Sequence, residues 1–154
     1  MKLYLARHGD YGLDASGLDV LSEKGIHDIT QMARSLKHMN LQVLSVLHSS
    51  KNRTMQTAAL LAQGFSCEES PQLHPGLEPD DDVLGFINEL VHWDEDILIV
   101  GHLPFMRKLV SQLLIGNDKK EIVHFHTGTL VLLSQVDKSH WMIDWVLTPT
   151  LVTN

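Results

Sequence analysis

The chain has 154 residues, 44% hydrophobic and 20% charged, a composition typical of one globular domain spanning residues 1–154. Its formal charge of −7 argues against a general nucleic-acid-binding protein, which needs a basic surface. The single cysteine excludes an internal disulfide, and the apolar runs are too short for a signal peptide or a membrane span. We therefore expect a cytoplasmic protein with no nucleic-acid or membrane partner.

Segments typical of strands and of helices alternate along the first two thirds of the chain. Short, apolar, β-branched runs predict strands at residues 2–6, 43–48 and 96–100. Apolar residues at helical spacing predict helices within residues 22–39, 49–64, 80–92 and 101–116. Ser22 is a candidate N-cap for the first of these helices, and Ser49 or Ser50 for the second.

The remaining segments predict shorter elements. Residues 65–79 are rich in turn-forming residues and leave room for a short edge strand. Residues 122–125, 129–135 and 141–147 predict late strands, antiparallel in part. We find no repeat, low-complexity segment or linker that would divide the chain.

This alternation predicts an α/β fold, a three-layer α/β/α sandwich around a mainly parallel sheet. In an open sheet of this kind, ligands bind beyond the carboxyl ends of the strands. Three predicted strands end there in polar residues: Arg7 and His8 after the first, Arg53 shortly after the second, and His102 after the third. We therefore expect two arginines and two histidines to meet at one rim of the sheet.

Such a cluster is suited to phosphoryl transfer. Arginine side chains bind phosphate oxygens in a planar, bidentate way and keep their charge. A neutral histidine can attack phosphorus, and neighbouring arginines lower the pKa of its imidazole. A second histidine, if protonated, would stabilise the transition state, so no metal or cofactor is needed. Gly9 and Gly101 would allow close approach to the backbone.

Other interpretations of the same residues stay open. Taken alone, Arg7-His8 is typical of a solvated loop and Arg53 of a solvated helix residue. A noncatalytic module that binds phosphate or a phosphoprotein would use the same pocket without turnover. His124 and His126 could ligate a metal in a hydrolase, but no completing ligand lies nearby in the sequence, which favours strand residues near the rim or solvent.

Four motifs occur in a fixed order: LARHGD, LSEKG, SSKNRTMQTA and LIVGHLP. Together they resemble the signature of the histidine phosphatase (phosphoglycerate-mutase-like) superfamily, over residues 1–104. The resemblance implies that His8 is the phosphorylated nucleophile, that Arg7 and Arg53 clamp the phosphoryl group, and that His102 completes the pocket. It also implies a phosphatase that works without a metal.

Many members of that superfamily carry an inserted cap between the second arginine and the second histidine. Only residues 54–101 separate Arg53 from His102, so we expect no large cap domain. The chain is similar to the compact SixA-type phosphohistidine phosphatases in this respect. An open rim suits a large substrate, which favours phosphohistidine on a protein domain of a signalling phosphorelay. A small-molecule phosphomonoesterase or mutase of the same superfamily is the alternative, with a small phosphate ester as substrate.

Relatives with alcohol leaving groups use a carboxylate as general acid. In the corresponding region, HPGLEPDDD offers Glu78 as the candidate and Asp80 as a poorer one. Glu78 could equally be a solvated turn residue, and an imidazole leaving group would make the acid less necessary. Asp10 would partly cancel the arginine charge, so we expect it to be a loop or helix-contact residue.

Overall fold

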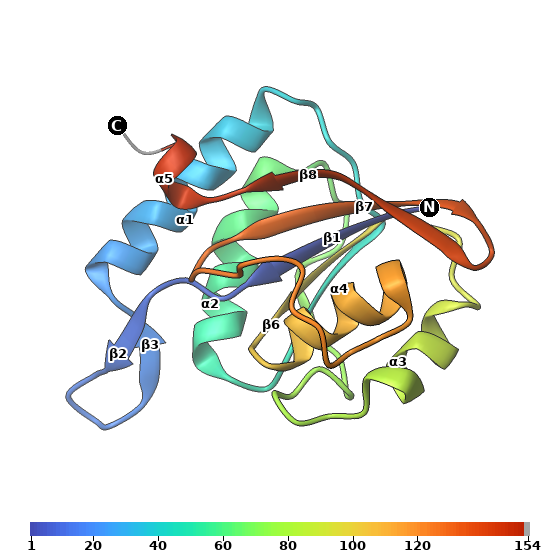
Figure 1. The fold of residues 1–154 in the computed structure, drawn as a ribbon. Helices are drawn as coiled ribbons and strands as arrows, with labels where there is room; N and C mark the ends of the chain where they lie inside the picture. The colour runs from blue at the N-terminus through green and yellow to red at the C-terminus, as the bar shows by residue number, and fades with distance from the viewer. Residues whose placement is uncertain (153–154) are drawn as a thin grey trace.

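A computed structural model describes residues 1–152. At its centre is a six-stranded sheet in the order β5-β4-β6-β1-β7-β8 (Figure 1). The four strands β5, β4, β6 and β1 run parallel, and β7 and β8 add an antiparallel edge. Their bounds are β1 Lys2–Arg7, β4 Ser45–His48, β5 Gln72–Leu73, β6 Ile97–Gly101, β7 Leu130–Asp137 and β8 His140–Leu147. The mainly parallel sheet predicted from the sequence is confirmed.

Helices cover both faces of this sheet (Figure 1). Successive side chains of a strand point to opposite faces, so β1 contributes Leu3 to one core and Tyr4 to the other. The Tyr4 side packs against α1 (Glu23–Lys37), α2 (Asn52–Leu61) and α5 (Pro149–Val152), with a 3₁₀ turn at Ala62–Gly64. The Leu3 side packs against α3 (Val83–Leu90) and α4 (Phe105–Ile115). These are the three layers of the expected sandwich.

Side-chain hydrogen bonds to backbone amides mark where α1 and α3 begin. Ser22 caps α1 as predicted, because its hydroxyl accepts from the Gly25 amide at 3.0 Å. The prediction that Ser49 or Ser50 caps α2 is wrong, since Lys51 occupies that position and makes no side-chain cap. Helix α3 begins three residues later than expected, where Asp82 accepts from two backbone amides.

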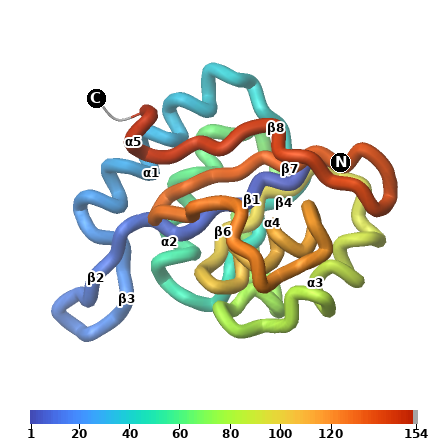
Figure 2. The backbone as a smooth tube through the Cα atoms, viewed as in Figure 1, coloured from blue at the N-terminus to red at the C-terminus, as the bar shows by residue number. Residues whose placement is uncertain are grey.

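Two segments have a secondary structure that the sequence did not predict. Residues 11–21, for which the sequence predicts neither strand nor helix, contain a hairpin of β2 (Tyr11–Leu13) and β3 (Asp19–Leu21) that projects from the body of the molecule (Figures 1 and 2). The predicted strand at residues 122–125 is wrong: this segment is a loop that leads into β7. Both lie beside the carboxyl end of β1, the end at which the predicted site lies.

The segment between α2 and β6 forms no cap over the sheet. It provides edge strand β5 and helix α3, and α3 packs against α4. Within residues 1–152, none of the helices has the length and apolar character needed to cross a membrane.

Candidate active site

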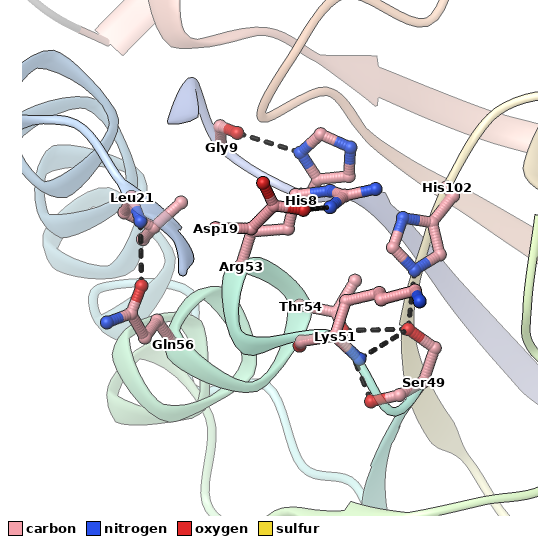
Figure 3. Close-up of polar contacts among 10 residues, drawn as sticks. All are labelled: His8, Gly9, Asp19, Leu21, Ser49, Lys51, Arg53, Thr54, Gln56 and His102. Carbon is pink, nitrogen blue, oxygen red and sulfur yellow. Dashed lines mark hydrogen bonds and ion pairs between the residues drawn. The ribbon is translucent and has the colours of Figure 1, made fainter. Parts of the chain in front are cut away.

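Strand register brings the predicted residues together. Arg7 of β1 is paired with Gly101 of β6, and His48 of β4 is paired with Val100, so the three strands end side by side. The backbone amide of His8 donates to the Gly101 carbonyl at 3.0 Å, which continues the ladder one step past the strand. Figure 3 shows His8, Arg53 and His102 converging from three different segments of the chain.

His8 is held as a neutral ring with one free nitrogen. Its Nδ1 lies 2.8 Å from the Gly9 carbonyl oxygen, which can only accept, so Nδ1 carries the proton. Nε2 therefore keeps its lone pair. Burial lowers the pKa of His8 to about 4, and the charges of Arg53 and Arg7 act in the same direction. A neutral imidazole at physiological pH is the form that a nucleophile requires.

His102 lies next to His8, with the ring centroids 5.3 Å apart. Its Nε2 is hydrogen-bonded to Ser49 Oγ. Thr54 donates its hydroxyl proton to the Lys51 carbonyl at 2.7 Å, so Ser49 donates to Thr54 Oγ1 at 2.8 Å and the Ser49 oxygen accepts from Nε2–H of His102. Nδ1 of His102 is buried and has no partner within residues 1–152. Protonation of the ring would turn Nδ1 into a second donor.

The pKa of His102 is also lowered to about 4, by burial first and then by His8 and Arg53. In the free protein His102 is therefore neutral, whereas transition-state stabilisation was expected from a protonated ring. A bound phosphoryl group would bring negative charge that favours the protonated form. In that protonated form the ring donates to Ser49 through Nε2 and can donate to a phosphoryl oxygen through Nδ1.

Both arginines are anchored at one end and leave a donor free. Arg7 Nη1 donates to the Phe125 carbonyl at 2.8 Å, and Arg53 Nη1 forms an ion pair with Asp19. The Nε of each arginine is buried without a partner within residues 1–152, as is Nδ1 of His102. Buried donors are almost always paired in proteins, so the two arginine Nε–H groups indicate a binding site for an acceptor. The acceptor that suits two guanidinium groups is an oxyanion.

Glu78 lies at the edge of this cluster. Its Oε1 accepts from the Ser50 amide at 2.8 Å, and its charge acts on His102. Burial acts to raise the pKa of Glu78, but the Ser50 hydrogen bonds, with His102 and Lys51, lower it on balance. An ionised carboxylate at neutral pH is a poorer proton donor than a general acid needs to be.

The two glycines of the cluster serve helix packing. A Cβ on Gly9 would meet Ile29 Cγ1 at 3.0 Å, and one on Gly101 would meet Met106 Sδ at 2.7 Å. The space beside each backbone is therefore filled by a helix side chain rather than left for a ligand. Asp10 contacts the start of α1 as predicted, because it accepts from the Ser22 hydroxyl at 2.5 Å.

The loop before β7 supports the site through hydrogen bonds that the sequence did not predict. The Gly128 amide donates to the His8 carbonyl at 2.9 Å, and the Arg7 amide donates to the Thr129 carbonyl at 3.0 Å. His124 and His126 lie in this loop, exposed, with their rings 4.0 Å apart. Within residues 1–152, no group of three or more His, Cys, Asp or Glu side chains is placed to hold a metal ion.

The buried histidines predict how stability depends on pH. Below a pKa of about 6.5 the unfolded chain binds a proton on each imidazole, whereas folded His8 and His102 stay neutral down to about pH 4. The free energy of unfolding is therefore expected to fall as the pH falls from 6.5 to 4. Urea titrations across that range should show a shallower dependence for His8→Asn and no change in slope for His124→Asn, an exposed control. A steeper dependence for His8→Asn would contradict the assigned protonation state.

Comparison with known proteins places this geometry in a family. The sequence profile of the histidine phosphatase superfamily (branch 1) matches residues 3–78. Phosphohistidine phosphatase SixA of Escherichia coli (strain K12) is 26% identical over 155 residues, covering 97% of this chain and 94% of that protein.

Solved structures of related proteins have the same fold. The protein histidine phosphatase SixA complexed with tungstate superposes with a TM-score of 0.85 at 24% identity, covering 99% of this chain and 100% of the other. The α-ribazole phosphatase of Shigella flexneri gives a TM-score of 0.70 at 17% identity, with 97% of each chain covered. The motif order, the fold and these relatives agree: the chain is similar to the histidine phosphatase superfamily and, in its compact architecture, to SixA.

Proposed function

We propose that this protein is a phosphatase that transfers a phosphoryl group to Nε2 of His8 and then to water, and that its substrate is phosphohistidine on a protein domain of a phosphorelay. One observation carries the proposal. Three buried nitrogens without partners in residues 1–152, Nε of Arg7, Nε of Arg53 and Nδ1 of His102, surround a neutral histidine. A phosphoryl group would accept from both arginines and lie in reach of Nε2 of His8. Its negative charge would favour a proton on Nδ1 of His102, which would then donate as well.

The first step is transfer to His8. The Nε2 lone pair attacks phosphorus while the P–N bond to the substrate imidazole breaks, and its electron pair stays on that imidazole. Phosphorylated His8 carries a positive ring charge, which the hydrogen bond from Nδ1 to the Gly9 carbonyl stabilises. Arg7 and Arg53 neutralise the phosphoryl oxygens throughout.

The second step is hydrolysis. Water attacks phosphorus, the bond to Nε2 breaks, and the electron pair returns to His8. One proton of the water is released and inorganic phosphate leaves. Glu78, ionised by its hydrogen bonds from Ser50, is better suited to accept that proton than to donate one to a leaving group.

The choice of phosphohistidine rests on two features of the rim. No cap covers the cluster, since the segment between Arg53 and His102 packs as β5 and α3, so a side chain carried on a domain has access. The ionised state of Glu78 suits imidazole, which leaves readily without a strong general acid. The match to SixA phosphohistidine phosphatase supports the same substrate class. An α-ribazole phosphatase among the structural relatives keeps a small phosphate ester as the competing substrate.

Steady-state kinetics on two substrate classes test the proposal. With excess chelator present, we expect kcat/KM to be at least about 100-fold higher for a domain phosphorylated on histidine than for sugar phosphates or phosphoserine. Glu78→Gln is expected to leave the rate of phosphoryl transfer from phosphohistidine to His8 within about tenfold of wild type, whereas loss of a true general acid would slow that step by about 10²–10⁴-fold.

Each of the other outcomes would assign a different function to this protein. Faster turnover of the small esters would make it a small-molecule phosphatase. Tight phosphate binding without any turnover would make it a binding module, and loss of activity in chelator would make it a metal-dependent hydrolase.

A further inference from the structure

Tyr11, the first residue of the β2–β3 hairpin, contacts two members of the catalytic cluster. Its ring face lies under the Arg53 guanidinium, with the carbon Cζ of Arg53 4.5 Å from the ring centroid. The same ring meets the imidazole of His8 edge to face, at a centroid distance of 5.1 Å. One aromatic ring thus touches the expected nucleophile and one arm of the phosphate clamp.

The hairpin presents a second contact to Arg53 on the same face. Tyr11 of β2 is paired with Leu21 of β3, and Asp19 lies two residues before Leu21. Residues two apart on a strand share a face, so Asp19 is the diagonal neighbour of Tyr11. Asp19 forms the ion pair with Arg53 Nη1. Gln56 of α2 accepts from the Leu21 amide at 2.7 Å, which fixes the hairpin against the helix that carries Arg53.

These contacts restrict a side chain that would otherwise be flexible. Arginine has a long stem whose rotamer freedom must be lost when it binds a ligand. Here the Arg53 side chain is only 13% exposed, its Cζ lies over the Tyr11 ring, and Asp19 forms an ion pair with Nη1. Nε remains a donor without a partner within residues 1–152. Figure 3 shows the guanidinium beside the ring of His8, with Asp19 next to it.

We propose that Tyr11 is a positioning residue, whose ring holds the Arg53 guanidinium and the His8 imidazole in the arrangement that receives a phosphoryl group. The inference rests on the proposed function, because it assumes that an oxyanion occupies the cluster. The ring carries this role, since both contacts are made by its face and edge. Pre-orienting Arg53 lowers the entropic cost of binding the oxyanion.

The role can be tested without unfolding the protein. All three residues of β2 are exposed, and Tyr11 itself is 44% exposed, so it adds little to the cores. Tyr11→Phe keeps the ring, Tyr11→Leu removes it, and Leu13→Ala is a control on the same strand, where Leu13 is 71% exposed. Vanadate, an analogue of phosphate, is the probe for titration. The Arg53 Nε–Hε NMR signal reports on the guanidinium directly.

Tyr11→Leu is expected to weaken vanadate binding by about 3- to 30-fold, the range of a partly desolvated cation–π contact. The Arg53 signal should lose its ring-current shift in the same variant. Tyr11→Phe and Leu13→Ala should bind vanadate within about twofold of wild type.

Two results would overturn the inference while leaving the proposed function intact: wild-type affinity in Tyr11→Leu, or equal losses in Tyr11→Phe and Tyr11→Leu. A wild-type protein that binds no vanadate would overturn the proposed function and this inference together.

Discussion

Replacing His8 by asparagine is expected to lower kcat/KM for phosphohistidine by about 10⁴-fold or more, because the variant has no nucleophile that could form the covalent intermediate. Asparagine can still donate to the Gly9 carbonyl that now accepts from Nδ1 of His8, so the local backbone should stay in place. His8 is 4% exposed, and an apolar replacement would leave that carbonyl without its donor. The asparagine variant therefore separates loss of chemistry from loss of structure.

Two further measurements complete that experiment. Vanadate should still bind to His8→Asn, because Arg7, Arg53 and His102 remain as donors. His124→Asn, a change at an exposed histidine of the loop before β7, should keep wild-type kcat/KM. Substantial turnover by His8→Asn would mean that phosphorus is attacked by water or by another side chain.

Replacing Arg53 by alanine is expected to have the second largest effect. Loss of one charged donor at a transferring oxyanion typically costs about 10²–10³-fold in kcat, and phosphate or vanadate binding should weaken as well. The change also frees Asp19, whose carboxylate is now paired with Arg53 and would stand uncompensated near the pocket. Repulsion between that carboxylate and the phosphoryl group adds to the loss.

Arg53→Lys provides the matched comparison. Lysine keeps the charge but cannot donate from a position equivalent to Nε, nor place a guanidinium over the Tyr11 ring, so we expect only partial recovery. Arg34→Ala, at an exposed position of α1, controls for the change in net charge. Vanadate affinity in Arg53→Ala equal to that of wild type would remove Arg53 from the clamp.

The parts of the site that lie on regular elements could be predicted from the sequence. Strands β1, β4 and β6 are short apolar runs, and parallel strands that alternate with helices must end at the same edge of the sheet. The placement of Arg7, His8 and His102 follows from that rule alone. Arg53 follows because α2 begins directly after β4.

The parts that depend on tertiary contacts could not be predicted. The β-branched and aromatic residues in 122–125 are typical of a strand, yet the segment is a loop whose Phe125 carbonyl accepts from Arg7. Strands β2 and β3 have three residues each, too few for a periodic signal. The pairing of Asp19 with Arg53 joins residues on different elements, which no local pattern reports.

The protonation states of the histidines in the site could be derived only from the structure. The sequence alone suggested a charged second histidine, but the burial of His102 beside His8 and Arg53 lowers its pKa to about 4. Burial and charge proximity are properties of the folded chain. The hydrogen bond between Nε2 of His102 and Ser49 then leaves Nδ1 as the ring nitrogen without a partner within residues 1–152.

The most direct test of the central claim is the position of the phosphoryl group on the protein. Acid-labile phosphoprotein can be trapped by rapid quenching at alkaline pH during turnover of a labelled phosphohistidine donor, then mapped by mass spectrometry and ³¹P NMR. We predict one phosphorylated residue, His8, modified at Nε2, because Nδ1 is engaged with the Gly9 carbonyl. Label on another residue, label on Nδ1 of His8, or label that persists in His8→Asn would contradict the account.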